Sequence, residues 1–208
     1  ELVRGGTSEW YWATDYVHGD LYEAEELFRQ KNSVQSKGYI LSTIQMVWSM
    51  AVLPVDGQYL GYPVFDGESV VLLVVTYRKC DTHSEFLHQQ EKTQEVVRLP
   101  LSAVKDCYNL ILHPSPLSLT RQPNNGTFEI IWPEQIRFAI SSRETLNFRD
   151  GDKLYFSIWY EDPDYREETL VRSAQDGTIL ERFSGDIRIM PTVNGGLSNS
   201  FGGTALLI

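Results

Sequence analysis

The chain has 208 residues, of which 42% are hydrophobic and 12% are aromatic. This composition excludes intrinsic disorder over most of the chain, and the length fits one domain with a sizeable core. The formal net charge of −10, from 28 acidic and 18 basic residues, excludes a generally basic surface of the kind that binds a phosphate backbone.

The basic residues are spread along the chain instead of being gathered in one segment. Most of them fall inside expected strands, where side-chain alternation would send them to solvent. We therefore expect no nucleic-acid binding by this segment. The residues concerned are Arg78, Lys79, Arg137, Arg143, Arg149, Arg166, Arg172, Arg182 and Arg188.

No apolar run reaches the length of about 20 residues that a membrane-spanning helix needs, and residues 1–4 lack the pattern of a signal peptide. The sequence therefore predicts a soluble chain without a membrane span. A start at Glu1 instead of methionine is typical of a trimmed or processed piece. Two cysteines, Cys80 and Cys107, are too few for a disulfide framework, so they leave the compartment and their own pairing open.

Residues 7–18 carry several large aromatic side chains without a clear period. This pattern predicts an entry loop or a short strand that contains Trp10, Tyr11, Trp12 and Tyr16. If these side chains are exposed, they mark a binding face; if they are buried, they cover one end of the core.

A short helix and two strand patterns follow. Residues 20–32 are rich in Glu and Ala, with Asp20 as a candidate N-cap, and predict the helix. Residues 39–53 alternate apolar with small or polar side chains, which predicts a strand; a helical spacing is also present, but the Ser, Thr and Val content favours β structure. The continuous β-branched run 70–77 predicts a central strand buried on both faces.

The middle of the chain is expected to be less regular. The polar residues 80–95 predict an exposed loop with a turn of helix. Ser102 is a candidate cap for a helix through Leu112, because the apolar residues after it have helical spacing and His113-Pro114 would stop the helix.

Six Asp-Gly or Asn-Gly pairs punctuate the sequence, and most are flanked by β-branched or aromatic runs. Such pairs favour type I′ turns, in which both central residues have positive φ, so they predict antiparallel hairpins. Strands are expected at 117–121, 127–132, 135–141, 153–160, 168–174, 178–183 and 186–190. The pairs are Asp56-Gly57, Asp66-Gly67, Asn125-Gly126, Asp150-Gly151, Asp176-Gly177 and Asn194-Gly195.

The last residues, 194–208, combine a glycine-rich stretch with an apolar, strand-like end. One interpretation is a last strand tied into the chain's own sheet; the other is an arm that adds a strand to an exposed edge of a neighbouring subunit. We expect a single domain over residues 1–193, followed by this segment. The candidate interface residues are Trp10, Tyr11, Trp12, Phe201, Leu206 and Leu207.

The cysteines and histidines support two further hypotheses. Cys80-x2-His83 and Cys107-x5-His113, with His88 between them, hold enough soft ligands for zinc, but the spacing is unlike the close pairs of structural zinc sites. Cys107 could act as a nucleophile with a histidine as its base, although no glycine elbow surrounds it. Buried cysteine and surface histidines are the simpler interpretation, so we expect no catalytic residue, no metal and no cofactor.

An aromatic and acidic cluster ends the expected strand 153–160. Trp159 or Tyr160 could stack on a sugar ring while Glu161 or Asp162 binds its hydroxyl groups. The cluster therefore predicts a possible glycan-binding site at one end of a sheet.

Three other interpretations of this cluster remain. A glycoside hydrolase would need a second carboxylate nearby, such as Glu129 or Glu134. A calcium loop would use Asp162, Asp164 and Glu168, which lack the glycine and the regular spacing of a known loop. A solvated acidic turn between two strands needs no ligand.

The turns and alternating runs predict an all-β fold, mainly an antiparallel β-sandwich, of which a jelly roll is one form, with one or two short helices in its connections. Without a catalytic signature, and with aromatic and apolar segments near its two ends, the chain is expected to be a non-enzymatic interaction or self-assembly module, such as a coat or shell domain. It would act as a homo-oligomer or with a protein partner. The alternative is a carbohydrate-binding or carbohydrate-cleaving domain.

Overall fold

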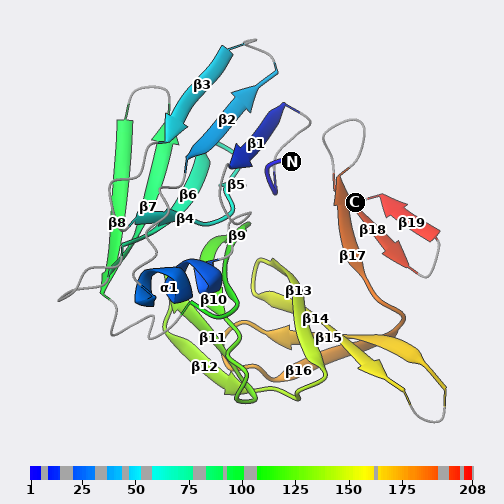
Figure 1. Cartoon of the computed structure of the whole chain (residues 1–208). Coiled ribbons are helices and arrows are strands. Elements are labelled where there is room, and N and C mark those ends of the chain that lie inside the picture. The colour runs from blue at the N-terminus through cyan, green and yellow to red at the C-terminus, as the bar shows by residue number, and fades with distance from the viewer. Residues whose placement is uncertain are drawn as a thin grey trace. The chain divides into compact units, whose positions relative to one another are not determined.

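The computed structural model describes residues 1–5, 9–14, 21–30, 37–43, 47–52, 58–76, 83–90, 93–100, 107–161, 164–191, 197–201 and 204–207. Over these residues the chain is mostly β, with antiparallel sheets and one short helix. This confirms the predicted class. The chain divides into two compact units, Glu1–Pro114 (unit 1) and Ser115–Ile208 (unit 2) (Figure 1).

Unit 1 consists of strands and the helix α1 (Leu21–Arg29). Its strands are β1 (Trp10–Thr14), β2 (Gly38–Ser42), β3 (Val47–Val52), β4 (Gln58–Leu60), β5 (Val64–Phe65), β6 (Val70–Thr76), β7 (His83–Gln90), β8 (Thr93–Pro100) and β9 (Leu110–Pro114). One sheet has the order β1-β2-β3. Another has the order β4-β6-β7-β8, and β5 also pairs with β6.

Helix α1 forms where apolar residues recur three positions apart. Leu21 and Ala24 are buried, whereas Tyr22 and Glu26 are exposed, so one face of the helix packs on unit 1 and the other meets solvent. The helix predicted from the sequence is confirmed, while its expected cap, Asp20, lies outside the described residues. No helix in the described part of the chain has the length and apolar character to cross a membrane.

Strand β6 confirms the predicted central strand. All seven of its residues are buried, and it has partners on both edges, with Val74 opposite Leu60 of β4 and Leu72 opposite Leu87 of β7. A buried strand must pair its N–H and C=O groups on both sides. β6 therefore requires neighbouring strands whatever their composition.

This requirement explains why residues 80–95 are not the expected loop. Their described residues belong to the hairpin of β7 and β8, in which Gln90 lies opposite Thr93 and His83 opposite Pro100. The polar composition of the segment indicated a loop, but polar side chains do not prevent the backbone from pairing with β6. The prediction was wrong because the demand for pairing comes from the preceding strand β6 and not from the composition of residues 80–95.

Residues 39–53 form two strands where one was expected. β2 and β3 pair antiparallel, with Leu41 opposite Trp48. The alternation of apolar residues predicted β structure correctly, but it continues through both strands and so does not show where the chain reverses.

The helix expected over residues 102–112 is also wrong in its described part. Residues 107–109 precede strand β9, in which Leu110 and Leu112 are buried and Ile111 between them is half-buried. This is the two-residue period of a strand. Residues 101–106 lie outside the described part of the chain.

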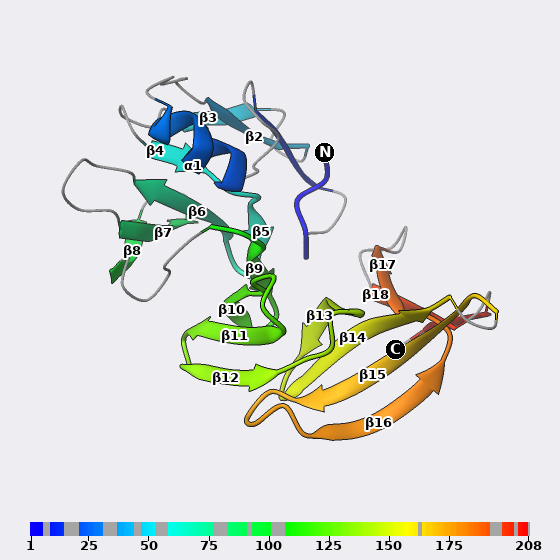
Figure 2. The same cartoon turned by 60° about the horizontal axis from the view of Figure 1, so that its bottom comes forward.

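In its described residues, unit 2 has strands and no helix. They are β10 (Leu117–Arg121), β11 (Thr127–Trp132), β12 (Ile136–Ala139), β13 (Glu144–Asp150), β14 (Lys153–Tyr160), β15 (Arg166–Ser173), β16 (Ile179–Ser184), β17 (Arg188–Pro191), β18 (Leu197–Phe201) and β19 (Thr204–Leu207). β11 pairs with β10 and β12, and β13-β14-β15-β16 form a meander (Figure 2). The strands predicted between residues 117 and 190 are confirmed, and β13 is an addition.

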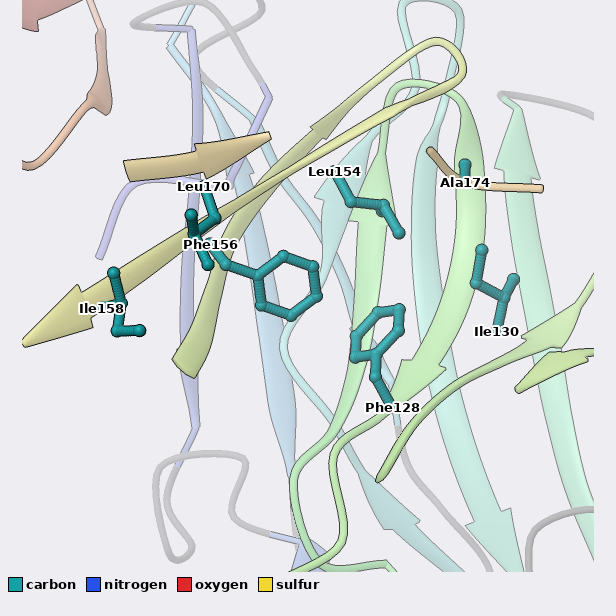
Figure 3. Close-up of a cluster of buried hydrophobic side chains, with 7 residues drawn as sticks. All are labelled: Phe128, Ile130, Leu154, Phe156, Ile158, Leu170 and Ala174. Carbon is teal, nitrogen blue, oxygen red and sulfur yellow. The ribbon is translucent and has the colours of Figure 1, made fainter. Parts of the chain in front are cut away.

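The β10–β12 strands and the β13–β16 meander pack on one another through an apolar cluster. Figure 3 shows the rings of Phe128 and Phe156 pointing toward one another, and their centroids lie 5.2 Å apart in an edge-to-face arrangement. Burial of each large side chain stabilises the fold by about 1.5–3 kcal/mol, so this cluster fixes the two layers together. Its members are Phe128, Ile130, Leu154, Phe156, Ile158, Leu170 and Ala174.

The predicted glycine turns join strands as expected, but in a different form. Gly67, Gly126, Gly151 and Gly177 all have positive φ, between 53° and 105°. The Asp or Asn before each of them is not among the residues with positive φ, so the turns are not of type I′. One left-handed glycine suits a longer hairpin loop. Asp56-Gly57 and Asn194-Gly195 lie outside the described residues.

The C-terminal segment forms strands within its own chain. β18 pairs antiparallel with β17, and β19 with β18. Leu206, for example, lies opposite Asn199. An arm on a neighbouring subunit, and a single domain over residues 1–193, stay predictions.

Candidate functional site

The aromatic and acidic cluster found in the sequence lies at the tip of the β14–β15 hairpin. Trp159 lies opposite Glu167, and Tyr160 lies opposite Arg166. Successive side chains of a strand point to opposite faces of its sheet. Trp159 and Tyr160 therefore belong to two different surfaces, although they are neighbours in sequence.

The outer tip, as we call the first surface, consists of Trp159, Tyr165 and Glu167. Trp159 is 39% exposed and Tyr165 is 68% exposed. The Tyr165 hydroxyl donates a hydrogen bond to the carboxylate of Glu167, which orients the aromatic ring. Large aromatic side chains that remain in water at one place are typical of surfaces that contact another molecule.

The inner tip, the second surface, consists of Tyr160, Glu168 and three arginines. The guanidinium carbon of Arg166 lies 4.1 Å from the centre of the Tyr160 ring, and that of Arg143 lies 5.7 Å away. Arg182 donates a hydrogen bond of 3.2 Å to the Tyr160 hydroxyl. Attraction between cations and the ring contributes about 0.5–1 kcal/mol per contact at exposed positions, so Tyr160 holds the three arginines together.

Glu168 is the negative group of the inner tip. Its carboxylate accepts a 2.5 Å hydrogen bond from Arg182 and lies 3.5 Å from Nε of Arg166. The hydrogen bonds to Tyr160 and to Glu168 raise the pKa of Arg182, which favours its charged form. Because two arginines occupy Glu168, the predicted calcium loop with Asp164 loses one of its oxygen ligands.

The charges of the inner tip do not cancel. Three guanidinium groups stand against the one carboxylate of Glu168, which leaves two positive charges in this group of residues. The expectation that the basic residues are not gathered is therefore wrong at this place. The absence of nucleic-acid binding stays a prediction.

The glycan site predicted from the sequence does not form one surface. The Arg166 guanidinium covers one face of the Tyr160 ring, which removes that face from stacking on a sugar. Glu161 is exposed, and Asp162 lies outside the described residues. Stacking on a sugar would fall to Trp159, and glycan binding stays a prediction.

Glu129, one of the two carboxylates considered for hydrolysis, is held between two arginines. Arg121 of β10 donates to it from Nε at 3.0 Å, and Nε of Arg137 on β12 lies 3.4 Å from its other oxygen. The Arg121 side chain is only 2% exposed. In this row of side chains across three strands, the Glu129 carboxylate neutralises the charge of the buried Arg121. A buried charge needs such a partner.

Glu134, the second of these carboxylates, is paired with Arg149. Arg149 donates to both of its oxygens at 3.3 Å, and this hydrogen bonding lowers the pKa of Glu134. A general acid for glycoside hydrolysis needs the opposite, a carboxyl whose pKa is raised so that it keeps its proton. The environment of Glu134 disfavours that role.

The structure brings together few of the residues considered for zinc. Cys107 and His113 are buried, with 4% and 8% exposure; His83 and His88 lie on β7, and Cys80 is outside the described residues. Within the described part of the chain, no group of three or more His, Cys, Asp or Glu residues is arranged to hold a metal ion.

The predicted interface residues near the N-terminus are divided between core and surface. Trp12 is 4% exposed and belongs to a buried cluster, while Trp10 stacks on Phe65 with ring centroids 6.4 Å apart. Tyr11 is 39% exposed, so a contact through β1 would use Tyr11 and not Trp12. Phe201, Leu206 and Leu207 lie on β18 and β19, and their side chains are outside the described part.

Sequence reasoning missed the inner tip as a unit. Alternation along β15 places Arg166 and Glu168 on one face, which is a usable signal. Arg143 precedes β13 and Arg182 lies on β16, and nothing local in the sequence connects them to Tyr160.

The chain matches no protein-family model, and comparisons with curated proteins and with solved structures find no match.

Proposed function

We propose that the chain is a non-enzymatic interaction module, that unit 2 is a β-sandwich, and that copies of the chain self-associate through the outer tip. The observation that carries the proposal is the exposure of Tyr165 (68%) and Trp159 (39%) on one hairpin, where Glu167 lies opposite Trp159 and binds the Tyr165 hydroxyl. Aromatic side chains provide much of the contact energy in protein interfaces because they bury a large area with few rotatable bonds.

The hairpin that carries the outer tip is firmly held in unit 2. Phe156 and Leu170 belong to the apolar cluster. The fully buried Thr169 donates a hydrogen bond of 2.9 Å to the carbonyl of Gly185 and accepts one of 2.9 Å from the N–H of Ile187. A surface on a fixed scaffold loses little conformational entropy when it binds, which supports a recognition role.

The state of the carboxylates supports a module without catalysis. Glu129 and Glu134 are each bound by arginine, and Glu144 is bound by Arg172. These groups stabilise the strands that carry them, and their oxygens are already occupied by strong charge-assisted hydrogen bonds.

A second copy of the chain is the partner that we propose. With a net charge of −10, two copies repel one another in general, so association needs a local patch that offsets the repulsion. The tip offers apolar area on its outer surface and excess positive charge on its inner surface. The apolar area favours burial in a contact, and the positive charge favours contact with a chain that is acidic elsewhere.

The test measures the self-association constant of the full chain by sedimentation equilibrium. A Trp159→Ser/Tyr165→Ser variant removes the aromatic side chains of the outer tip. A matched Ile179→Ser/Leu180→Ser variant removes two other exposed apolar side chains, 47% and 49% exposed, from β16. We expect the tip variant to weaken association at least about tenfold and the matched variant to leave it unchanged. A wild-type chain that stays monomeric at high concentration, or equal effects of the two variants, would refute the proposal.

One observation favours glycan binding as a second candidate. The exposed Trp159 ring lies beside Glu167, so a stacking surface and a hydroxyl acceptor occur together. Titration of wild type and a Trp159→Phe variant with a panel of oligosaccharides, followed by tryptophan fluorescence, tests it. A change that is present in wild type and lost in the variant supports the candidate, and no change in wild type rejects it.

A further inference from the structure

We propose that the inner tip binds carboxylate groups, and that in the assembly these carboxylates belong to helix α1 of a second copy. This inference rests on the proposed self-association, and it names a contact which that proposal does not specify. The inner tip consists of Tyr160, Glu168, Arg143, Arg166 and Arg182, as defined above.

The arginines of the inner tip still have several hydrogen-bond donors to offer. Among the described residues, the guanidinium of Arg143 has no hydrogen bond or ion pair, and its contact is with the face of the Tyr160 ring. Nε of Arg166 lies 3.5 Å from the Glu168 carboxylate, and Arg182 uses Nη1 for both Tyr160 and Glu168. Each guanidinium has five N–H donors, so most of these donors remain available for a ligand.

The positive charge of the inner tip also favours a carboxylate ligand. The two excess positive charges of the inner tip occur in a chain whose net charge is −10, and the arginine side chains are about half exposed, 49% for Arg166 and 51% for Arg182. They are accessible, and a carboxylate that approaches them replaces water with charge-assisted and bidentate hydrogen bonds.

Contacts within the inner tip already hold the arginines in place. The guanidinium carbon of Arg166 lies 4.1 Å from the centre of the Tyr160 ring, and Arg182 is held by the hydroxyl of the same ring and by Glu168. Long side chains normally lose conformational freedom when they bind. Here the fold has already restricted them, which lowers the cost of capturing an anion.

Helix α1 has the features of a matching partner surface. Its buried residues Leu21 and Ala24 fix the side that faces unit 1, and Glu23 and Glu26 are on the exposed side. Residues three positions apart on a helix have Cβ atoms about 5–6 Å apart, so Glu26 can engage a guanidinium group while Glu23 adds negative charge beside it. The 41% exposed Tyr22 adds an aromatic contact beside them.

A charge exchange tests the pairing in the full chain. Arg143→Glu changes a side chain without hydrogen bonds in the described structure, and Glu26→Arg changes an exposed residue of α1, so both variants should fold. We expect each single variant to weaken self-association about tenfold or more, because like charges then face one another. The double variant Arg143→Glu/Glu26→Arg should recover most of the wild-type affinity.

The matched control is Lys153→Glu, which makes the same change of charge at a 45% exposed cation outside the tip. It should leave association nearly unchanged, and circular dichroism should confirm that all variants are folded. Higher salt should weaken the association of wild type, since exposed charge pairs are screened.

The outcomes separate this inference from the proposed function. If wild type associates through the outer tip but Arg143→Glu has no effect beyond that of Lys153→Glu, the inner tip contact is refuted and the proposed function stands. If both single variants weaken association and the double variant does not recover it, the pairing with α1 is refuted. If wild type does not associate at all, the proposed function fails first, and the contact between copies fails with it.

Discussion

Arg172 donates to both carboxylate oxygens of Glu144, from Nε at 2.8 Å and from Nη2 at 2.9 Å, although the two side chains are only 11% and 3% exposed. The N–H of Ser141 also donates to Glu144, at 2.9 Å. Arg172 uses its remaining Nη1 to donate to the carbonyl of Gly177 at 2.7 Å. One ion pair thus connects the start of β13, the end of β15 and the turn that follows it.

Removing one partner of this pair should destabilise unit 2 strongly. Arg172→Leu leaves the Glu144 carboxylate buried without its cation, and we expect a loss of about 3–5 kcal/mol in the free energy of unfolding. Urea unfolding followed by circular dichroism measures it.

The control for this prediction is Arg137→Leu, which removes a 54% exposed partner of Glu129 and should cost about 1 kcal/mol or less. The double variant Glu144→Leu/Arg172→Leu should be less destabilised than Arg172→Leu alone, because no unpaired charge remains. Equal losses for Arg172→Leu and Arg137→Leu would show that the buried pair does not act as described.

Glu134 should contribute a stability that depends on pH. Its hydrogen bonds to Arg149 lower its pKa below the ordinary value of 4.5, so the folded state binds the proton less tightly than the unfolded state does. The contribution is therefore complete above the ordinary pKa and is lost as the pH falls through the lower, folded pKa. The difference in unfolding free energy between wild type and Glu134→Gln should be positive at neutral pH and shrink below pH 4.5. A difference that grows toward acid would contradict the assigned pairing.

Gly177 and Gly151 form a matched pair of turn glycines. Both have positive φ, 75° and 53°, so alanine costs about 1–2 kcal/mol at either position. A Cβ at Gly177 would also overlap the ring of Phe138, whereas a Cβ at Gly151 meets nothing within 4 Å.

We therefore expect Gly177→Ala to lose about 1–3 kcal/mol more than Gly151→Ala, from overpacking of the ring. Thermal unfolding of the two variants in parallel compares them directly. Similar melting temperatures would mean that Phe138 moves aside without cost.

Several elements of this protein could be predicted from neighbouring residues alone. The Asp-Gly and Asn-Gly pairs placed hairpin turns at Gly67, Gly126, Gly151 and Gly177, because glycine adopts positive φ without a steric cost. The continuous apolar run of β6 predicted a strand buried on both faces, and the Glu- and Ala-rich composition of residues 20–32 predicted helix α1. The sequence signals for these features lie within a few neighbouring residues.

The predictions that were wrong share another cause. β7 and β8 are polar in sequence and form strands because the edge of β6 requires partners. Arg149 and Arg172 were expected in solvent, but Arg149 is buried and the Arg172 side chain is only 11% exposed, because carboxylates from other segments, Glu134 and Glu144, lie within reach. Alternation assigns a side chain to one of two faces, but it does not tell which face the fold will cover.

The outer and inner tips also show which features are local in the sequence and which depend on the tertiary structure. The sequence alone determined that Trp159 and Tyr160 lie near the end of a β-strand beside acidic residues, because the alternating pattern and the turn signals are local. Only the tertiary structure decided that Trp159 joins Tyr165 on the outer surface while Tyr160 gathers Arg143, Arg166 and Arg182 on the inner one. The physical reason is that strand pairing brings residues together across long sequence separations, and local propensities carry no record of those partners.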